Sequence, residues 1–397
     1  MKMKKSRILA LLLALMMCLG LAACGKEPAP APGGDGETAA QTLNLGFIGP
    51  LTGPAALYGM NANNGAKIAV DEINAMDPNF QIVYNPQDDE HDAEKAVNAY
   101  NTLMGQGAQA IVGCVTSVPC NAVAARAFVD RVFMLTPSAS STSVTEGRDN
   151  VYQMCFTDPK QGVVSADFIK DNGLATKIGA IYNNSDAYST GIYEAFKAEA
   201  AAIGLEIVSE TTFTDDTAND FSVQLADAKN KGAELIFIPI YYTPASLILN
   251  QAKSMQYDVK FFGCDGLDGI LDMAGFDKTL AEGLLLMTPF AATAQDELTK
   301  NFVAKYQEAY NEVPSQFAAD GYDCVYALYN AVKVAGVDPT GMSAAELCEL
   351  LIATLSSESF SMDGLTGTGM VWSATGEVSR DPKVYEIKDG AYSEVQQ

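Results

Sequence analysis

The stretch that decides the fold runs from Ile111 to Ser143 and reads IVGCVTSVPCNAVAARAFVDRVFMLTPSASSTS. Two short apolar runs, residues 110–113 and 132–135, are typical of strands buried on both faces of a parallel sheet. The alanine-rich segment between them, residues 121–130, predicts a helix. The first run leads into Thr116-Ser117 and the second into the hydroxyl-rich segment 136–142. The stretch therefore predicts a strand–helix–strand unit of an α/β fold.

The ends of these two strands are candidate binding positions. In an open parallel sheet, ligands bind outside the carboxyl ends of the strands, where loop amides and helix N-termini face outward. Hydroxyls and free amides at two neighbouring strand ends would suit a carboxylate or another small anion. The alternative is that these serines and threonines only cap the helices that follow.

The N-terminus predicts a lipoprotein signal peptide at residues 1–23. Four basic residues among the first seven precede the apolar run 8–19, and Leu21-Ala22-Ala23-Cys24 resembles a bacterial lipobox. The resemblance implies cleavage before Cys24 and a lipid on its sulfur; a plain signal peptide that contains Cys24 is the alternative. Residues 24–42 would then be the lipidated cysteine and a flexible, Pro/Gly/Ala-rich linker. No later run approaches the length of about 18 apolar residues that a spanning helix needs.

Composition narrows the class of protein. The formal net charge is −24, which excludes nucleic-acid binding through phosphate contacts. We interpret the excess acid as a solvated surface. About 355 residues follow the linker, which is more than one hydrophobic core usually supports, so two lobes are expected.

Six cysteines remain after Cys18 and Cys24 are set aside. None forms a CxxC pair, and most stand in apolar runs, so buried thiols are favoured over a disulfide framework. A Cys114–Cys120 bridge stays open. These cysteines are Cys114, Cys120, Cys155, Cys264, Cys324 and Cys348.

The rest of the chain alternates strand and helix patterns. Expected strands are 43–48, 80–84, 178–182, 205–208, 235–238, 261–264, 284–287, 369–372 and 384–387. Expected helices are one beginning near Tyr58 and those at 93–104, 161–172, 191–203, 222–231, 245–255, 296–310, 318–334 and 344–355. A small-sided stripe on the first helix, Ala62, Ala66, Ala69 and Ile73, would let that helix lie close against a sheet. Strands that return after three successive helices predict a chain that crosses between its lobes more than once.

The sequence contains few residues or motifs that could support catalysis. His91 is the only histidine, and the sequence has neither a GxSxG elbow nor a GxxxxGK[ST] loop. The acidic segment 88–92 and the later group Asp265, Asp268 and Asp272 match no EF-hand spacing. We therefore expect a binding protein with no catalytic residue, metal or cofactor.

Motifs in a fixed order cover nearly the whole chain after the linker. They are GPLTGP at 49–54, Tyr58-Gly59, Gly65-Ala66, Ile73-Asn74, 113–117, Thr136-Pro137-Ser138-Ala139, Asp220-Phe221-Ser222 with Gln224, Tyr241-Tyr242, Gln251-Ala252 and 263–266. Together they resemble the type I periplasmic binding proteins. More narrowly, they are similar to the leucine/isoleucine/valine-binding proteins of ABC importers.

The resemblance implies two Rossmann-like α/β lobes joined by three crossovers, with the ligand between them. The N-terminal lobe would comprise residues 43–158 plus 288–378, and the C-terminal lobe residues 159–287 plus 379–397.

The resemblance also implies the N-terminal lobe's share of the site. Ser117, Ser138, Ala139 and Ser140 would hold the ligand's carboxylate and part of its ammonium. Tyr58 would line the pocket for the ligand's side chain.

The C-terminal lobe would close the site from the other side. Tyr188 and the segment 240–242, with Tyr241 and Tyr242, would cover the ligand, and Asp265 would accept its α-ammonium. Donors on one side and a buried acid on the other suit a zwitterion, because a buried carboxylate is costly unless a cation completes it.

Several positions depart from the family's pattern. Ser140 replaces a threonine, Ile240 a small residue, Leu267 an aromatic and Ser189 a glycine. Thr116 and the acidic loop stand where some family members have the two cysteines of a disulfide. The pocket for the ligand's side chain is therefore reshaped, while the end that binds the zwitterion is nearly intact.

We expect a lipid-anchored, extracytoplasmic substrate-binding protein that captures a branched-chain or other apolar amino acid. Its partners would be the ligand, the permease subunits of an ABC importer and, through the anchor, the membrane. One alternative is a relative that binds an amide, urea or aromatic acid. Another is a ligand sensor for a membrane receptor. An enzyme is the weakest reading, because it needs His91 beside a nucleophile.

Overall fold

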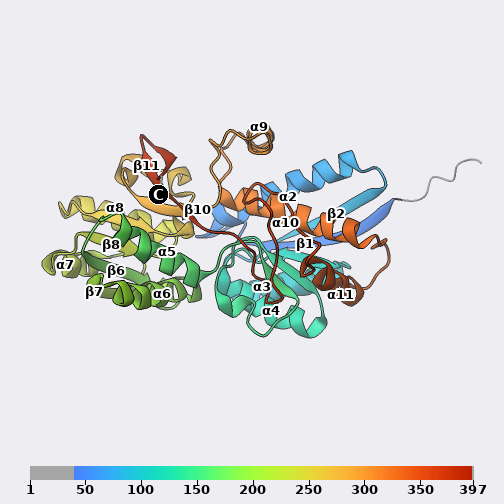
Figure 1. Cartoon of the computed structure of the whole chain (residues 1–397), viewed down its shortest axis with the longest axis horizontal. Coiled ribbons are helices and arrows are strands. Elements are labelled where there is room, and N and C mark those ends of the chain that lie inside the picture. The colour runs from blue at the N-terminus through green and yellow to red at the C-terminus, as the bar shows by residue number, and fades with distance from the viewer. Residues whose placement is uncertain (1–39, 396–397) are drawn as a thin grey trace, which may run out of the picture. The chain divides into compact units, whose positions relative to one another are not determined.

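The computed structural model describes residues 40–395, which belong to one compact unit that begins at Ala40 (Figure 1). The predicted signal peptide, Cys24 and the linker up to residue 39 lie outside the described residues. The linker prediction ran two residues too far, since Gln41 and Thr42 already belong to the first strand.

The first sheet is entirely parallel, with strand order β2-β1-β3-β4-β5. Its central strands β3 and β4 are buried along their whole length, as the continuous apolar runs predicted. In chain order its strands are β1 (Gln41–Gly49), β2 (Phe80–Asp88), β3 (Ala110–Gly113), β4 (Phe133–Thr136) and β5 (Val151–Gln153).

The second sheet is mixed, with order β12-β11-β10-β9-β8-β6-β7. Its strands from β6 to β10 pair in parallel, and the last two strands of the chain add an antiparallel edge. The strands are β6 (Lys177–Asn183), β7 (Glu206–Phe213), β8 (Leu235–Ile238), β9 (Lys260–Gly263), β10 (Leu285–Thr288), β11 (Lys383–Lys388) and β12 (Ala391–Glu394).

The helices divide between two lobes. Those of the first lobe are α2 (Ala56–Met76), α3 (Ala93–Gly105), α4 (Ser117–Asp130), α9 (Glu297–Tyr310), α10 (Gln316–Ala335) and α11 (Ala344–Leu355). Those of the second are α5 (Asp158–Asp171), α6 (Ala187–Ile203), α7 (Ser222–Asn230) and α8 (Tyr242–Ser254). Figure 1 shows α10, late in the chain, beside α2, and α11 packs against α10 and β4. The fold is therefore α/β with two lobes, as expected.

Helix α2, which carries the small-sided stripe, lies against strands β1 and β2 as expected and packs still more extensively against α10. A Cβ on Gly65 would lie 1.8 Å from the carbonyl oxygen of Ala318, and one on Gly321 would lie 2.1 Å from that of Ala62. Glycine at these two positions lets the two helix backbones approach closely.

Within the described residues the chain passes between the lobes three times. The crossings follow β5, precede α9 and precede β11, at residues 154–157, 289–296 and 379–382. The third crossing carries Arg380, whose Nη2 lies 2.8 Å from Oδ1 of Asp320 on α10, both side chains being buried. Lys160 of α5 donates to the carbonyl of Arg380 at 2.9 Å. Arg380 thus links both lobes at the crossing.

Several local predictions were wrong. Helix α4 begins at Ser117, four residues earlier than expected. Strands β5 and β12 were missed, and residues 369–372 form only isolated bridges, Met370 with Met362 and Trp372 with Val378. The six cysteines of the described chain are buried free thiols, so the Cys114–Cys120 bridge is absent here.

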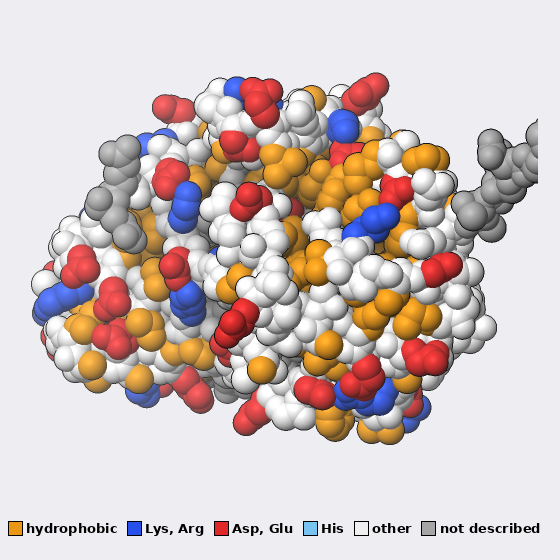
Figure 2. Space-filling view, turned by 45° about the vertical axis from the view of Figure 1, so that its right-hand side comes forward, with side chains coloured by type: hydrophobic (Ala, Val, Ile, Leu, Met, Phe, Trp, Pro, Cys, Tyr) orange, Lys and Arg blue, Asp and Glu red, His pale blue; other side chains and the backbone are white. Residues whose placement is uncertain are grey.

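The surface matches the acidic composition. Figure 2 shows acidic side chains spread over the visible face, among hydrophobic and uncharged ones. A search of the described helices for a segment long and apolar enough to cross a membrane finds none.

Candidate ligand-binding cleft

The first-lobe wall of the cleft is built by the carboxyl ends of β3 and β4. Ser117 begins α4, and its hydroxyl oxygen accepts from the amide of Ser141 at 3.3 Å. The Ser138 hydroxyl donates to the carbonyl of Val115 at 2.7 Å. The hydroxyls that the sequence analysis proposed as ligand donors therefore also form hydrogen bonds between the two loops.

These hydrogen bonds determine which backbone and side-chain groups of the two loops remain free to bind a ligand. The amide of Ala139 donates to the Thr136 hydroxyl at 2.8 Å, so it serves the loop and not the cavity. The Ser117 hydroxyl accepts one bond from Ser141 and keeps its proton to donate. Because Ser117 also opens a helix of 14 residues, its side chain and the helix N-terminus can act together on an anion.

Aromatic rings line much of the rest of the cleft. Tyr188 and Tyr241 from the second lobe stack with ring centroids 5.0 Å apart. Tyr58 from α2 meets Tyr241 edge-on at 5.4 Å and Phe317 from α10 at 4.5 Å. The walls contributed by both lobes are therefore apolar faces with phenol hydroxyls at their edges.

Tyr58 also ties the two lobes together. Its hydroxyl donates to the carbonyl of Gly266 at 2.5 Å and accepts from the amide of Tyr242 at 3.1 Å. The Tyr242 ring packs against Tyr58 at 4.8 Å, and its hydroxyl accepts from the Leu57 amide at 3.3 Å. Tyr242 thus supports Tyr58 from behind rather than lining the cavity. The lobes are in direct contact, so the cleft is closed.

Asp265 is the acid that faces the cavity. It follows β9, is 3% exposed, and its Oδ1 accepts from the Tyr188 hydroxyl at 2.8 Å. The same hydroxyl accepts from the Gly266 amide at 2.9 Å, and the Asp265 amide donates to Gln161 at 3.1 Å. Burial raises the pKa of the Asp265 carboxyl to about 6, against hydrogen bonds from Tyr188 and Gln161 that lower it.

Two further acids stand near it. Asp158 opens α5 and is fully buried, with neither carboxylate oxygen hydrogen-bonded. Burial raises its pKa well above the usual value, while the nearby Ser140 hydroxyl acts in the opposite direction. Asp186 caps α6, and burial raises its pKa to about 7. A cation in the cleft would favour the charged forms of these two acids, whose pKa values burial has raised.

The cavity itself is small. Its free volume is about 10 Å³, roughly what one water molecule needs, so the lobes must part before anything larger enters. Six of the nine predicted site residues line it: Tyr58, Ser117, Ser138, Tyr188, Tyr241 and Asp265. Ala139, Ser140 and Tyr242 are buried but do not line the cavity. No lysine or arginine lines the cavity in the described chain.

Thr116, which the sequence placed at a candidate strand end without a ligand role, also lines the cavity. Sequence reasoning missed three further lining residues, Val115, Gly266 and Phe317. The first two adjoin candidate residues and could have been included on that ground. Phe317 comes from α10, about fifty residues beyond Asp265, and only the packing of α10 on α2 brings it to the cleft; no local pattern marks it.

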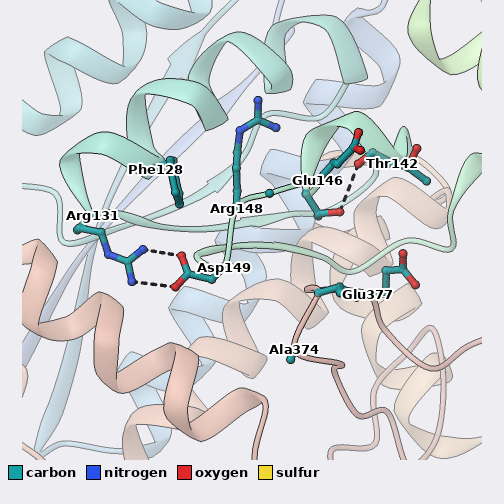
Figure 3. A pocket seen from close by; sticks show the side chains of 11 residues that line it. Phe128, Arg131, Thr142, Glu146, Arg148, Asp149, Ala374 and Glu377 are labelled. Carbon is teal, nitrogen blue, oxygen red and sulfur yellow. Dashed lines mark hydrogen bonds and ion pairs between the residues drawn. The ribbon is translucent and has the colours of Figure 1, made fainter.

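A second, larger hollow lies on the first lobe (Figure 3). Its free volume is about 710 Å³, but its two arginines already have partners. Arg131 pairs with Asp149 at 2.5 Å and with Glu349 at 2.6 Å, and Arg148 donates to the Ser143 carbonyl at 2.5 Å. A hollow whose cations are already paired is a weaker ligand site than the cleft.

Comparisons with known proteins agree with the two-lobed architecture. A family model described as periplasmic binding protein matches residues 42–391. A Leu/Ile/Val-binding protein of Rhizobium johnstonii is 30% identical over 74% of this chain and 80% of its own. A leucine-, isoleucine-, valine-, threonine- and alanine-binding protein of Pseudomonas aeruginosa is 28% identical over 77% and 82%.

Solved structures give the same result. A branched-chain amino acid transporter substrate-binding protein of Streptococcus pneumoniae, in complex with isoleucine, superposes with a TM-score of 0.79. It is 28% identical and covers 90% of this chain and 100% of its own. A leucine-binding protein of Thermotoga maritima also has a TM-score of 0.79, at 26% identity and over 89% and 98% of the chains.

Proposed function

The chain belongs to the periplasmic binding protein family and is a substrate-binding protein of the ABC-transporter type. From this premise we propose that it captures a branched-chain or other apolar amino acid between its lobes and delivers it to an importer. The proposal extends to the anchor, with a lipid on Cys24 holding the exported protein at the membrane.

The observation that carries the ligand assignment is the placement of Asp265. It is the acid that lines the cavity, and it faces the cleft from the second lobe with Tyr188 hydrogen-bonded to it. The hydroxyl of Ser117 and the N-terminus of α4 face the cleft from the first lobe. An ammonium on one side and a carboxylate on the other would satisfy both walls, as in a zwitterionic amino acid.

The remaining walls set the side-chain preference. Tyr58, Tyr241, Phe317 and Val115 offer mainly apolar surface, which favours an uncharged, apolar side chain. Binding follows opening of the lobes, because the closed cavity is too small for an amino acid. On closure over a ligand, the rings of Tyr188 and Tyr241 would settle against it rather than against each other.

An aromatic acid is the second candidate, and the aromatic walls favour it. Such a ligand would stack on these rings and place its carboxylate at Ser117. It has no ammonium for Asp265, whose carboxylate would then oppose binding unless protonated.

A thermal-shift screen separates the candidates. We expect leucine, isoleucine or valine at millimolar concentration to raise the melting temperature at pH 7.5, because a ligand that binds only the folded state stabilises it. Benzoate, urea and small amides serve as comparison ligands. A rise with benzoate and none with any amino acid would replace the amino-acid proposal with the aromatic-acid one.

A further inference from the structure

We propose that His91 is a positioning residue of the cleft: its imidazole bonds the loop 89–92 to Thr116 and, beside Tyr58, forms a contact of the first lobe with Tyr241 when the cleft closes. The inference rests on the proposed function, because closure over a ligand is the event that this contact would assist. It assigns a role to the one histidine of the chain, which the proposed ligand contacts do not use.

The backbone conformation of the loop 89–92 sets the orientation of the His91 imidazole. Glu90 and His91 have φ values of 50° and 62°, two consecutive left-handed residues that are not glycine. Such conformations persist where the surroundings enforce them. Here the buried Asp89 carboxylate accepts from the His91 amide at 2.9 Å, and the Asp92 amide donates to the Asp89 carbonyl at 2.8 Å.

One nitrogen of the imidazole contacts Thr116 in the first-lobe wall of the cleft. His91 Nδ1 lies 2.8 Å from the hydroxyl oxygen of Thr116. Thr116 is the N-cap residue of α4, yet its side chain makes no capping bond to the helix, although that is the usual bond of a threonine in this position. The hydroxyl is directed to the histidine instead. This bond joins the same two segments at which the family pattern had led us to note a missing disulfide.

The opposite lobe supplies the ring's other neighbour. The imidazole meets the Tyr241 ring edge-on, with centroids 5.6 Å apart and planes at 80°. Tyr241 stands at the start of α8 in the second lobe and stacks on Tyr188. The His91–Tyr241 contact therefore exists only while the lobes are together, whereas the His91–Thr116 bond lies within the first lobe.

Closure also changes the ring's electrostatic surroundings. Burial lowers the pKa of His91, and the charges of Asp215 and Asp92 oppose this. When the lobes part, the ring loses Tyr241 and is hydrated, so its pKa returns toward about 6.5. The closed form then binds fewer protons than the open form, and acid favours opening. The acidic groups near the ring are Asp92 and Asp89 on its own loop and Asp215 on the second lobe, whereas Glu90 is paired with Lys95.

Calorimetry with L-leucine tests the closing contact. His91→Ala should weaken binding about 3- to 10-fold, the factor that one aromatic contact contributes. Thr116→Val, which keeps the shape but removes the hydroxyl, should weaken it about twofold. The double variant should match His91→Ala alone, because Thr116 acts through the ring. Glu90→Gln breaks only the exposed pair with Lys95 and should bind as the wild type does.

Because His91 is the only histidine, nuclear magnetic resonance of its imidazole in tag-free protein gives a direct second readout. Saturating L-leucine should lower the ring's pKa, and Thr116→Val should shift its resonances even without ligand. Between pH 7.5 and 5.5 the wild type should lose up to about tenfold more leucine affinity than His91→Gln does.

Two outcomes would overturn the proposal. The first is a ring pKa that leucine leaves unchanged, together with resonances indifferent to Thr116→Val. The second is leucine binding that His91→Ala does not weaken. A wild type that binds no amino acid would instead refute the proposed function. In that case the effect of Thr116→Val on the His91 resonances would still show whether the His91–Thr116 hydrogen bond exists.

Discussion

Replacing Asp265 with asparagine is the sharpest test of an ammonium-bearing ligand. The carboxylate is 3% exposed and accepts the Tyr188 hydroxyl at 2.8 Å, so a bound ammonium would meet it with little water between them. A charge-assisted hydrogen bond of this kind contributes about 1.5–3 kcal/mol. Asp265→Asn keeps the shape and loses that charge, so leucine affinity should fall about 10- to 150-fold.

Comparison variants separate this effect from general damage. Asp265→Ala should cost at least as much as Asp265→Asn, because it also strands the Tyr188 hydroxyl. Ser117→Ala should cost only about 1 kcal/mol, since backbone amides of α4 would still hold the carboxylate. Asp323→Asn is the matched control: this carboxylate is fully buried but accepts from Leu365 and Thr366, away from the cavity. Its leucine affinity should stay at the wild-type value.

The assay is calorimetry with leucine and with its deaminated keto acid. The keto acid should bind poorly to the wild type, because it brings no cation to the Asp265 carboxylate. Leucine affinity should also fall as the pH drops through about 6, where burial places the pKa of this carboxyl. The amino-acid assignment would be refuted if the wild type bound leucine and the keto acid equally well and Asp265→Ala left leucine affinity unchanged.

The remaining predictions concern motion, anchoring and pH. Small-angle scattering should show a smaller radius of gyration with saturating leucine than without it, since the lobes hinge shut over a ligand; an unchanged radius would argue against a closing trap. Cys24→Ala should release the protein from the membrane fraction, or leave its signal unprocessed, without altering ligand affinity; normal processing with continued membrane partition would exclude the lipid anchor. The unliganded protein should become more stable as the pH falls from about 7 toward 4, because burial raises the pKa of Asp89 and Asp186 to about 7, so the folded chain binds more protons than the unfolded one. Thermal unfolding across that range checks the sign, and stability that rises with pH would contradict it.

The sequence predicted the fold well because the signals that define it are local. The apolar runs that became β3, β4 and β8 had to be strands buried on both faces. The edge strands β5 (VYQ) and β12 (AYSE) were missed because neither is a continuous apolar run and both are too short to show an alternating pattern. The helix start at Ser117 was misplaced because the helix was expected to begin only after Pro119 and Cys120, although proline suits the first turn of a helix.

The site was predicted less completely, for a reason of packing. Residues at strand ends, such as Ser117 and Asp265, follow from the topology of a parallel sheet. Phe317 and the contact between His91 and Thr116 depend on which distant segments meet, and no periodicity encodes that. Ala139 came to the site through the resemblance alone, and its role stays a prediction; the fold adds that its amide donates to the Thr136 hydroxyl.

The three crossings between lobes have a consequence for the order in which the molecule can be made. The second sheet gains β11 and β12 only from residues 383–394, and α2 meets α10 only once residues 316–335 exist. A nascent chain that ends before those segments has an unpaired edge at β10 and an uncovered flank on α2. Neither lobe can therefore mature as an independent N-terminal domain during synthesis. Stable half-molecules should not be obtainable by simple truncation, because each lobe is completed by a segment that follows residue 315.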